Sequence, residues 1–203
     1  MNTDTRNKFL QTGIRLYPQL GYHKLSVRLL AAEAGMSAGM FHHCFESKDD
    51  FIRQLLAHQE YLFTASVPEP AEEMSPQQQL RTFLEWFAGC IRSDLPWVRR
   101  MLDDCAAGAE TVAAFIRQGL QQDFEHIDTL LRRCLPDCSE NDYLLRHNFL
   151  IISAVAPILL VNQFSELDIL PLPPEAAAFV CSDEAVRQRL DWVFAVLFPS
   201  DAV

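Results

Sequence analysis

The sequence lacks long apolar runs, glycine-rich segments and alternating polar–apolar segments. Only 7 of its 203 residues are glycine, and none of them lies in a phosphate-binding loop. Without alternating segments, β-strands are not expected. The longest apolar run, residues 149–161, contains Ser153 and Pro157 and is shorter than the roughly 20 residues that span a bilayer. The N-terminal residues lack the apolar core of a signal peptide, so we expect a cytoplasmic protein.

The sequence also lacks the residue arrangements typical of active sites. No nucleophile lies in a pattern with a general base, and Cys134 and Cys138 do not match the ligand spacing of a zinc site. We therefore predict no catalytic residue, no metal and no cofactor, which makes an all-helical enzyme the least favoured class. The 6 cysteines are scattered, as is typical of reduced, buried thiols, and a thiol that responds to oxidation stays an alternative.

Charge is unevenly distributed along the chain. The formal net charge is −10, from 17 Lys and Arg against 27 Asp and Glu. Residues 1–48 hold six basic and three acidic side chains, a net charge of +3, whereas the remainder holds 11 against 24, a net charge of −13. A basic N-terminal segment on an acidic protein indicates that this segment binds a polyanion such as DNA.

Apolar residues recur at helical spacing along nearly the whole chain. The pattern predicts an all-α fold of about nine helices, with loops at the proline-rich segments 67–76 and 168–177. Serines precede many of the expected helices, where their hydroxyl groups can cap the first turn. The helices are expected at residues 4–20, 26–33, 37–44, from Ser47 through Leu62, and at 75–93, 96–105, 111–135, 139–164 and 182–198.

The segment SVRLLAAEAGMSAGMFHHCF, residues 26–45, contains two short helices joined at Gly35. Helices of two turns are not stable alone, so this pair must pack against neighbours. A short helix, a glycine-containing turn and a second short helix form the helix-turn-helix layout, whose second helix enters the DNA major groove. The serines at 26 and 37 would place helix N-termini near phosphates. The alternative is an ordinary helical hairpin.

Several short motifs have an order and spacing that match a known pattern without a gap: Gly21-Tyr22, Ser26-Val27-Arg28, Ala31-x2-Ala34-Gly35-Met36-Ser37, Gly39-x-Phe41, Phe45 and Ser47-Lys48-x2-Phe51. Through them, residues 6–56 resemble the N-terminal DNA-binding domain of the TetR/AcrR family of bacterial regulators. The resemblance implies a three-helix helix-turn-helix DNA-binding domain over residues 1–48 and a helical effector-binding and dimerisation domain over residues 49–203. It also implies a homodimer, a pseudo-palindromic operator in double-stranded DNA and a small-molecule effector.

Matching positions imply DNA contacts at Ser26, Arg28, Ser37, His42 and Lys48. The chemistry of the second short helix adds Ala38, Met40 and His43. Arg28 is expected to read bases, Ala38 and Met40 to contact thymine methyl groups, and Lys48 to bind phosphate. The family usually has tyrosine at the position of His42, so this contact could depend on pH, because histidine titrates near neutrality. A neutral surface histidine is the alternative.

The resemblance also directs attention to apolar residues after residue 75. An effector pocket is expected to include Trp86, Met101, Phe115, His147 and Ile151, which suits a largely apolar or aromatic effector. The dimer interface is expected to include Ile152, Val155, Leu159, Leu190, Phe194 and Leu197, from the helices at 139–164 and 183–198. These features predict a ligand-responsive transcriptional regulator, specifically a repressor. The alternative is a regulator controlled by a protein partner or by thiol oxidation.

Overall fold

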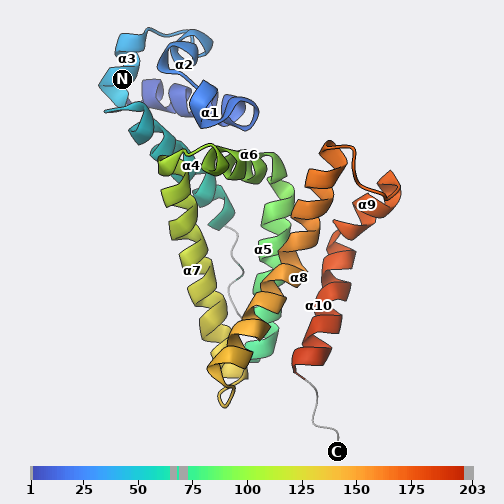
Figure 1. The fold of residues 1–203 in the computed structure, drawn as a ribbon. Helices are drawn as coiled ribbons and strands as arrows, with labels where there is room; N and C mark the ends of the chain where they lie inside the picture. Colours follow the sequence, from blue (N-terminus) through green and yellow to red (C-terminus); the bar gives the residue numbers. More distant parts are fainter. Residues whose placement is uncertain (1, 65–67, 69–72, 199–203) are drawn as a thin grey trace, which may run out of the picture. The chain divides into compact units, whose positions relative to one another are not determined.

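A computed structural model describes residues 2–64, 68 and 73–198. This part of the chain forms ten α-helices and no β-strand, which confirms the predicted all-α class (Figure 1). The helices are α1 (Asn2–Lys24), α2 (Val27–Glu33), α3 (Ala38–Cys44), α4 (Lys48–Thr64), α5 (Pro76–Ser93), α6 (Leu95–Ala106), α7 (Glu110–Cys134), α8 (Glu140–Glu166), α9 (Pro174–Val180) and α10 (Asp183–Leu197).

One helix is additional to those expected. The segment 168–177 was predicted to be a loop, but α9 begins inside it at Pro174. Proline is favoured at the first helical position, because the N–H group it lacks has no helical acceptor there. Half of the other predicted loop, residues 67–76, lies outside the described residues, and its last residue, Pro76, begins α5.

Serine caps begin the helices where the sequence predicts them. The Oγ of Ser26 accepts a hydrogen bond from the N–H of Leu29 at 3.2 Å, and the Oγ of Ser37 accepts one from Met40 at 3.3 Å. Ser75 and Gln78 form a reciprocal capping box at the start of α5. Each cap contributes about 1 kcal/mol, which matters most for helices as short as α2 and α3.

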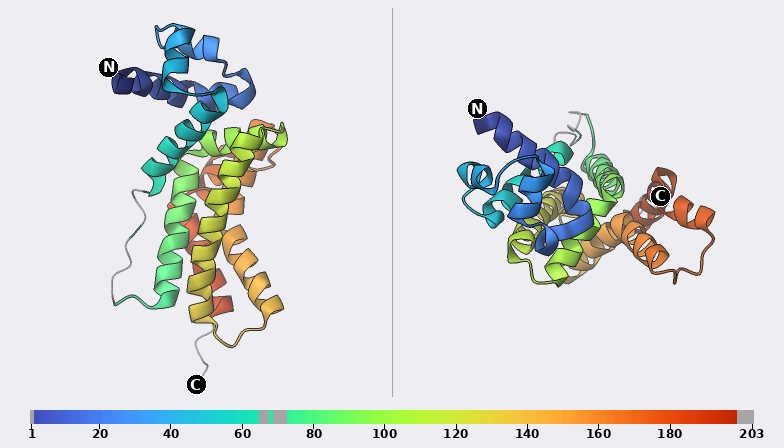
Figure 2. Two further views of the ribbon diagram at one scale, coloured as in Figure 1. Left: turned by 90° about the vertical axis from the view of Figure 1, so that its left-hand side faces the viewer. Right: turned by 90° about the horizontal axis from the view of Figure 1, so that it is seen from above.

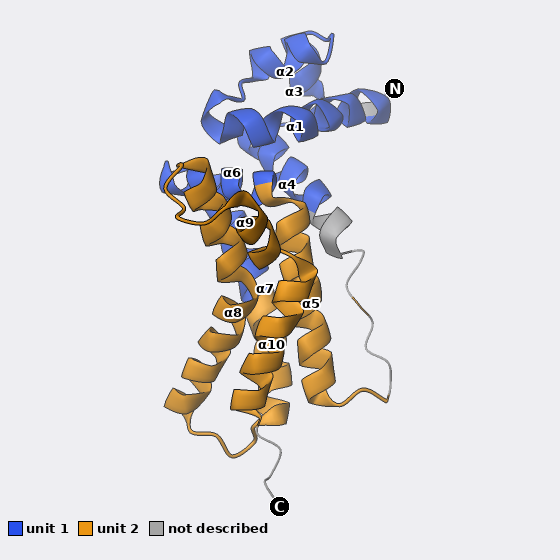
Figure 3. Ribbon diagram, turned by 90° about the vertical axis from the view of Figure 1, so that its right-hand side faces the viewer, with its two compact units in different colours: residues 1–66, 96–122 blue, residues 67–95, 123–203 orange. Residues whose placement is uncertain are grey.

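The helices divide into two compact units, which Figure 3 colours separately. The first unit contains α1 to α4, α6 and the part of α7 up to Gln122. The second contains α5, the part of α7 from Asp123 onward, and α8 to α10. These units describe packing, and the functional boundary expected between residues 48 and 49 stays a prediction.

An aromatic cluster forms the core beside α3 in the first unit. The ring centroids of Phe9 and Phe41 are 5.4 Å apart, those of Phe41 and Phe45 are 5.0 Å apart, and those of Phe45 and Phe51 are 4.9 Å apart. All four side chains are buried. Because these rings come from α1, α3, the residue that ends α3, and α4, they hold a two-turn helix that could not persist alone.

In the second unit, α8 and α10 lie side by side and both pack against α5 (Figures 1 and 2). Two ion pairs join α5 to α10, with 2.5 Å between Arg81 Nη1 and Asp191 Oδ1 and 2.5 Å between Arg92 Nη1 and Asp183 Oδ1. The buried side chains between these helices include Leu84, Leu150, Ala154, Ile158 and Leu190.

Candidate nucleic-acid interface

A tight turn of residues 34–37 joins α2 to α3. Gly35 has a φ of +66°, and the N–H of Met36 donates to the carbonyl of Ala31 at 2.8 Å. Phe41 is the side chain that α3 buries, whereas Met40 is exposed. The opposite side of α3 is therefore available for a ligand, as a recognition helix requires.

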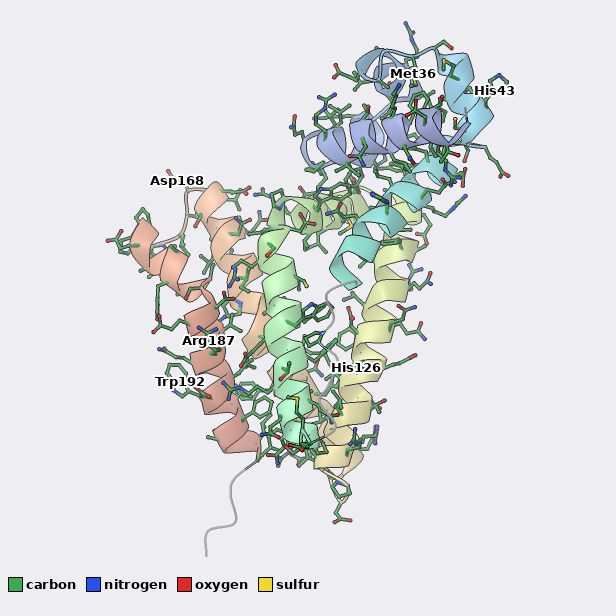
Figure 4. The ribbon with its side chains drawn as sticks, turned by 180° about the vertical axis from the view of Figure 1, so that it is seen from behind. Met36, His43, His126, Asp168, Arg187 and Trp192 are labelled. Carbon is green, nitrogen blue, oxygen red and sulfur yellow. The ribbon has the colours of Figure 1, made fainter. Side chains whose placement is uncertain are left out.

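The predicted DNA contacts occupy accessible positions in this helix pair. Figure 4 shows Met36 in the turn and His43 on the outer side of α3. Each capping serine accepts a hydrogen bond from its helix and retains its own hydroxyl proton for donation to a phosphate. The exposed predicted contacts are Ser26, Arg28, Ser37, Ala38, Met40, His42 and His43, and Lys48 is half-buried.

Acidic side chains near the helix pair are few. Helix α3 contains none, and Glu33 at the end of α2 is paired with Arg15 of α1, with 2.8 Å between Oε2 and Nη2. Helix α3 itself therefore adds no negative charge that would oppose the approach of a phosphate backbone.

Lys48, at the start of α4, is placed by Tyr22. Its Nζ lies 4.3 Å from the centroid of the Tyr22 ring. Partial burial lowers the pKa of Lys48, although the nearby carboxylates of Asp49 and Asp104 act in the opposite direction. Sequence reasoning included Tyr22 in a motif but gave it no place in the site. The sequence does not show that the N–H of Tyr22 contacts Asp104 of α6, which lies 82 residues further along the chain.

A short helix, a tight turn and a second short helix with one buried and one exposed side define a helix-turn-helix DNA-binding domain. Residues 9–55 match the sequence model of the bacterial regulatory proteins of the tetR family. The match shows that this N-terminal segment is similar to the regulatory proteins of the tetR family. A comparison with curated proteins found no match.

Solved structures extend the likeness to the rest of the chain. A TetR-like transcriptional regulator from Rhodococcus sp. RHA1 has a TM-score of 0.65 and 16% identity, and the match covers 97% of each chain. The Flavonoid-responsive Regulator FrrA has a TM-score of 0.66 and 17% identity, over 96% of this chain and 97% of its own. The regulator PfmR from Thermus thermophilus has a TM-score of 0.61 and 22% identity, over 91% of this chain and 96% of its own. The chain thus has the fold of TetR-like regulators.

One side of the second unit exposes large apolar side chains. Ile152 is 57% exposed, and Trp192 and Val196 are each 68% exposed. With Phe149 and Leu160 they line a groove of about 720 Å³ along α8 and α10. We call these five residues the α8–α10 face, and Figure 4 shows Trp192 pointing outward from α10. Such a contiguous apolar surface is typical of an interface with another molecule.

The predicted dimer residues differ in their exposure, and their place in an interface stays a prediction. Val155, Leu190 and Leu197 are buried within the second unit. Leu159 and Phe194 are partly buried against the same core, and Ile152 is exposed. Helix α8 is thus apolar on two sides, one turned toward the core of the unit and the other exposed.

Helix α8 is longer than the apolar run that we expected to be too short to cross a membrane. Among the described residues, α8 alone is long and apolar enough to cross a membrane by length and composition. We expected the run 149–161 to be too short, but the helix extends to 27 residues. Its buried side, including Leu150 and Ile158, packs within the second unit, as in a helix that joins a core to an interface.

The predicted effector residues fall in both units. Met101 and Phe115 pack against the core of the first unit, and Phe115 lines a groove of about 520 Å³ beside Arg53 and Thr111. In the second unit, Trp86 and Ile151 pack against the core and His147 is buried, with its ring centroid 5.4 Å from that of Phe124. These five assignments stay predictions.

His126 of α7 belongs to an aromatic cluster that sequence reasoning missed. Its ring centroid is 4.5 Å from that of Phe83, which in turn is 5.3 Å from Trp86 (Figure 4 labels His126). Partial burial lowers the pKa of His126, which favours the neutral imidazole at pH 7. A neutral imidazole beside aromatic rings offers both a hydrogen-bond donor and an acceptor to a flat ligand.

The cysteines bear on the alternative of control by oxidation. None of the six, all of which lie in the described part of the chain, forms a disulfide, and all are partly buried. Burial raises the pKa of the Cys105, Cys134 and Cys181 thiols. Since the thiolate is the reactive form, these environments disfavour a sensing role for the three residues.

Proposed function

We propose that this chain is a ligand-responsive transcriptional repressor that binds a pseudo-palindromic operator as a homodimer in the cytoplasm. The observation that carries the proposal is the accessible α2–α3 pair, with Arg28 exposed and no acidic residue in α3. The tetR-family match over residues 9–55 supports the same reading.

In this proposal, α3 lies in the major groove. Arg28 reads a base edge, and the methyl-bearing Ala38 and Met40 contact thymine methyl groups. Lys48 and the capping serines bind phosphates and fix the orientation of the domain. Since α3 presents few hydrogen-bonding groups, specificity depends strongly on half-site spacing and DNA shape.

The α8–α10 face supports the homodimer. Its exposed apolar side chains would be removed from water by the same face of a second copy, as two-fold symmetry requires. Two DNA-binding domains must reach major grooves about 34–36 Å apart. An effector that favours a different separation of the two domains would lower operator affinity, which is allostery in the thermodynamic sense.

A largely apolar, aromatic effector fits the aromatic cluster of Phe83, Trp86 and His126. FrrA, which shares this fold at 17% identity, is named as flavonoid-responsive. The proposed effector class is tested by adding candidate aromatic compounds to the operator complex and measuring DNA release. Binding that raises the melting temperature without releasing DNA would contradict the repressor mechanism.

The DNA contacts are tested with Arg28→Ala and Lys48→Ala. The first variant should relax sequence preference by about 1–3 kcal/mol at one base pair, whereas the second should weaken binding to all sequences alike. Fluorescence anisotropy with operator and scrambled duplexes over a salt series separates the two effects. If both variants lose affinity equally for both duplexes, the division of roles is wrong.

A further inference from the structure

The aromatic ring of Tyr22 lies against the ammonium group of Lys48. Nζ of Lys48 is 4.3 Å from the ring centroid, a distance at which a cation is attracted to the negative face of an aromatic ring. A lysine side chain has four rotatable bonds and loses much conformational freedom when it binds a fixed partner. A lysine already held by a ring loses less of that freedom when DNA arrives.

The ring itself is fixed through its hydroxyl group. Tyr22 Oη donates a hydrogen bond to Oδ1 of Asp49 at 2.5 Å, and the hydroxyl of Thr111 donates to the same oxygen at 2.9 Å. The hydrogen bond to Asp49 raises the pKa of Tyr22, and the bonds from Tyr22 and Thr111 lower the pKa of Asp49. At neutral pH the pair is therefore a protonated phenol and a carboxylate, which form a strong hydrogen bond.

The backbone of Tyr22 is fixed as well. Its N–H donates to Oδ2 of Asp104 at 2.7 Å, across 82 residues of sequence. Asp104 is only 3% exposed, and its Oδ1 lies 3.5 Å from Nε of Arg100. Tyr22 is thus anchored to α4 by its hydroxyl and to α6 by its N–H, so the ring cannot move away from Lys48 without breaking charged hydrogen bonds.

We propose that Tyr22 is a positioning residue, whose ring holds the Lys48 ammonium group in place for a DNA phosphate. The inference rests on the phosphate contact of Lys48 in the proposed function. It assigns Tyr22 a role in DNA affinity that acts through Lys48.

A double-mutant cycle on the full chain tests this role. The variants are Lys48→Gln, Tyr22→Leu and the double variant, with Tyr22→Phe as the matched control that keeps the ring. The probe is a fluorescent duplex of mixed sequence, about 30 base pairs long, titrated over a salt series, because phosphate contacts dominate such binding. Circular dichroism establishes that each variant is folded, and Tyr22→Met replaces the leucine variant if that one is not.

Tyr22→Leu should weaken binding about fivefold in the unchanged chain and less than about twofold in the Lys48→Gln background. Tyr22→Phe keeps the ring but loses the hydroxyl group that fixes it, so it should lose less affinity than Tyr22→Leu. Additive losses in the cycle would overturn the inference while leaving the phosphate contact of Lys48 intact. A salt slope unaltered by Lys48→Gln would instead overturn that contact, and the inference with it.

A nuclear magnetic resonance measurement on the free protein gives an independent readout. The Cε protons of Lys48 should resonate upfield because of the Tyr22 ring current. This shift should persist in Tyr22→Phe and disappear in Tyr22→Leu. An ordinary lysine shift in the unchanged chain would contradict the proposed placement.

Discussion

Replacing Gly21 by alanine should destabilise the first unit strongly. Gly21 has φ +67° and ψ −177°, a region essentially confined to glycine, which costs other residues about 1–3 kcal/mol. An added Cβ would lie 2.5 Å from Oδ1 of Asp104 and 2.7 Å from Nε of Arg100. Displacing the buried carboxylate also weakens its hydrogen bond with the Tyr22 N–H, at about 1.5–3 kcal/mol. The expected loss in unfolding free energy is about 3–5 kcal/mol.

Gly35→Ala is the matched control for this prediction. Gly35 has a similar φ of +66°, but no atom lies within 4 Å of an added Cβ, so only backbone strain of about 1–2 kcal/mol is expected. Urea unfolding at equal protein concentration, followed by circular dichroism, measures both losses. Equal destabilisation by the two variants would refute the argument that Asp104 and Arg100 restrict residue 21.

Two further predictions concern assembly and pH. Trp192→Glu should convert the proposed dimer to a monomer in sedimentation experiments, and an unchanged dimer would exclude this tryptophan from the interface. Hydrogen bonds from Tyr22 and Thr111 lower the pKa of Asp49, so their stabilisation is present at neutral pH and lost below about pH 4. Thr111→Val should reduce this acid dependence in unfolding experiments.

Local chemistry made much of the fold predictable from the sequence. Ser26, Ser37 and Ser75 begin helices because their hydroxyl groups satisfy N–H groups a few residues further along the chain. Pro76 lies at the start of α5, where proline is favoured. Pro174 obeys the same rule, but the neighbouring prolines led us to predict a loop around it.

Contacts between distant segments could not be predicted. The sequence identifies α8 as apolar but does not show that Val155 faces the core and Ile152 faces outward, because both sides of the helix carry large apolar residues. Likewise, nothing near Tyr22 in sequence indicates that its N–H will meet Asp104, 82 residues away. Candidate DNA-contact residues could be proposed from the sequence because they lie within one short, continuous segment.

The central claim is that the chain recognises a particular DNA sequence through α3. The most direct measurement is selection of bound fragments from genomic DNA, followed by titration of the recovered fragment and a scrambled duplex at near-physiological salt. The account predicts a pseudo-palindromic fragment bound at least about a thousandfold more tightly than the scrambled duplex. Equal affinity for both duplexes, with the same salt slope, would contradict it.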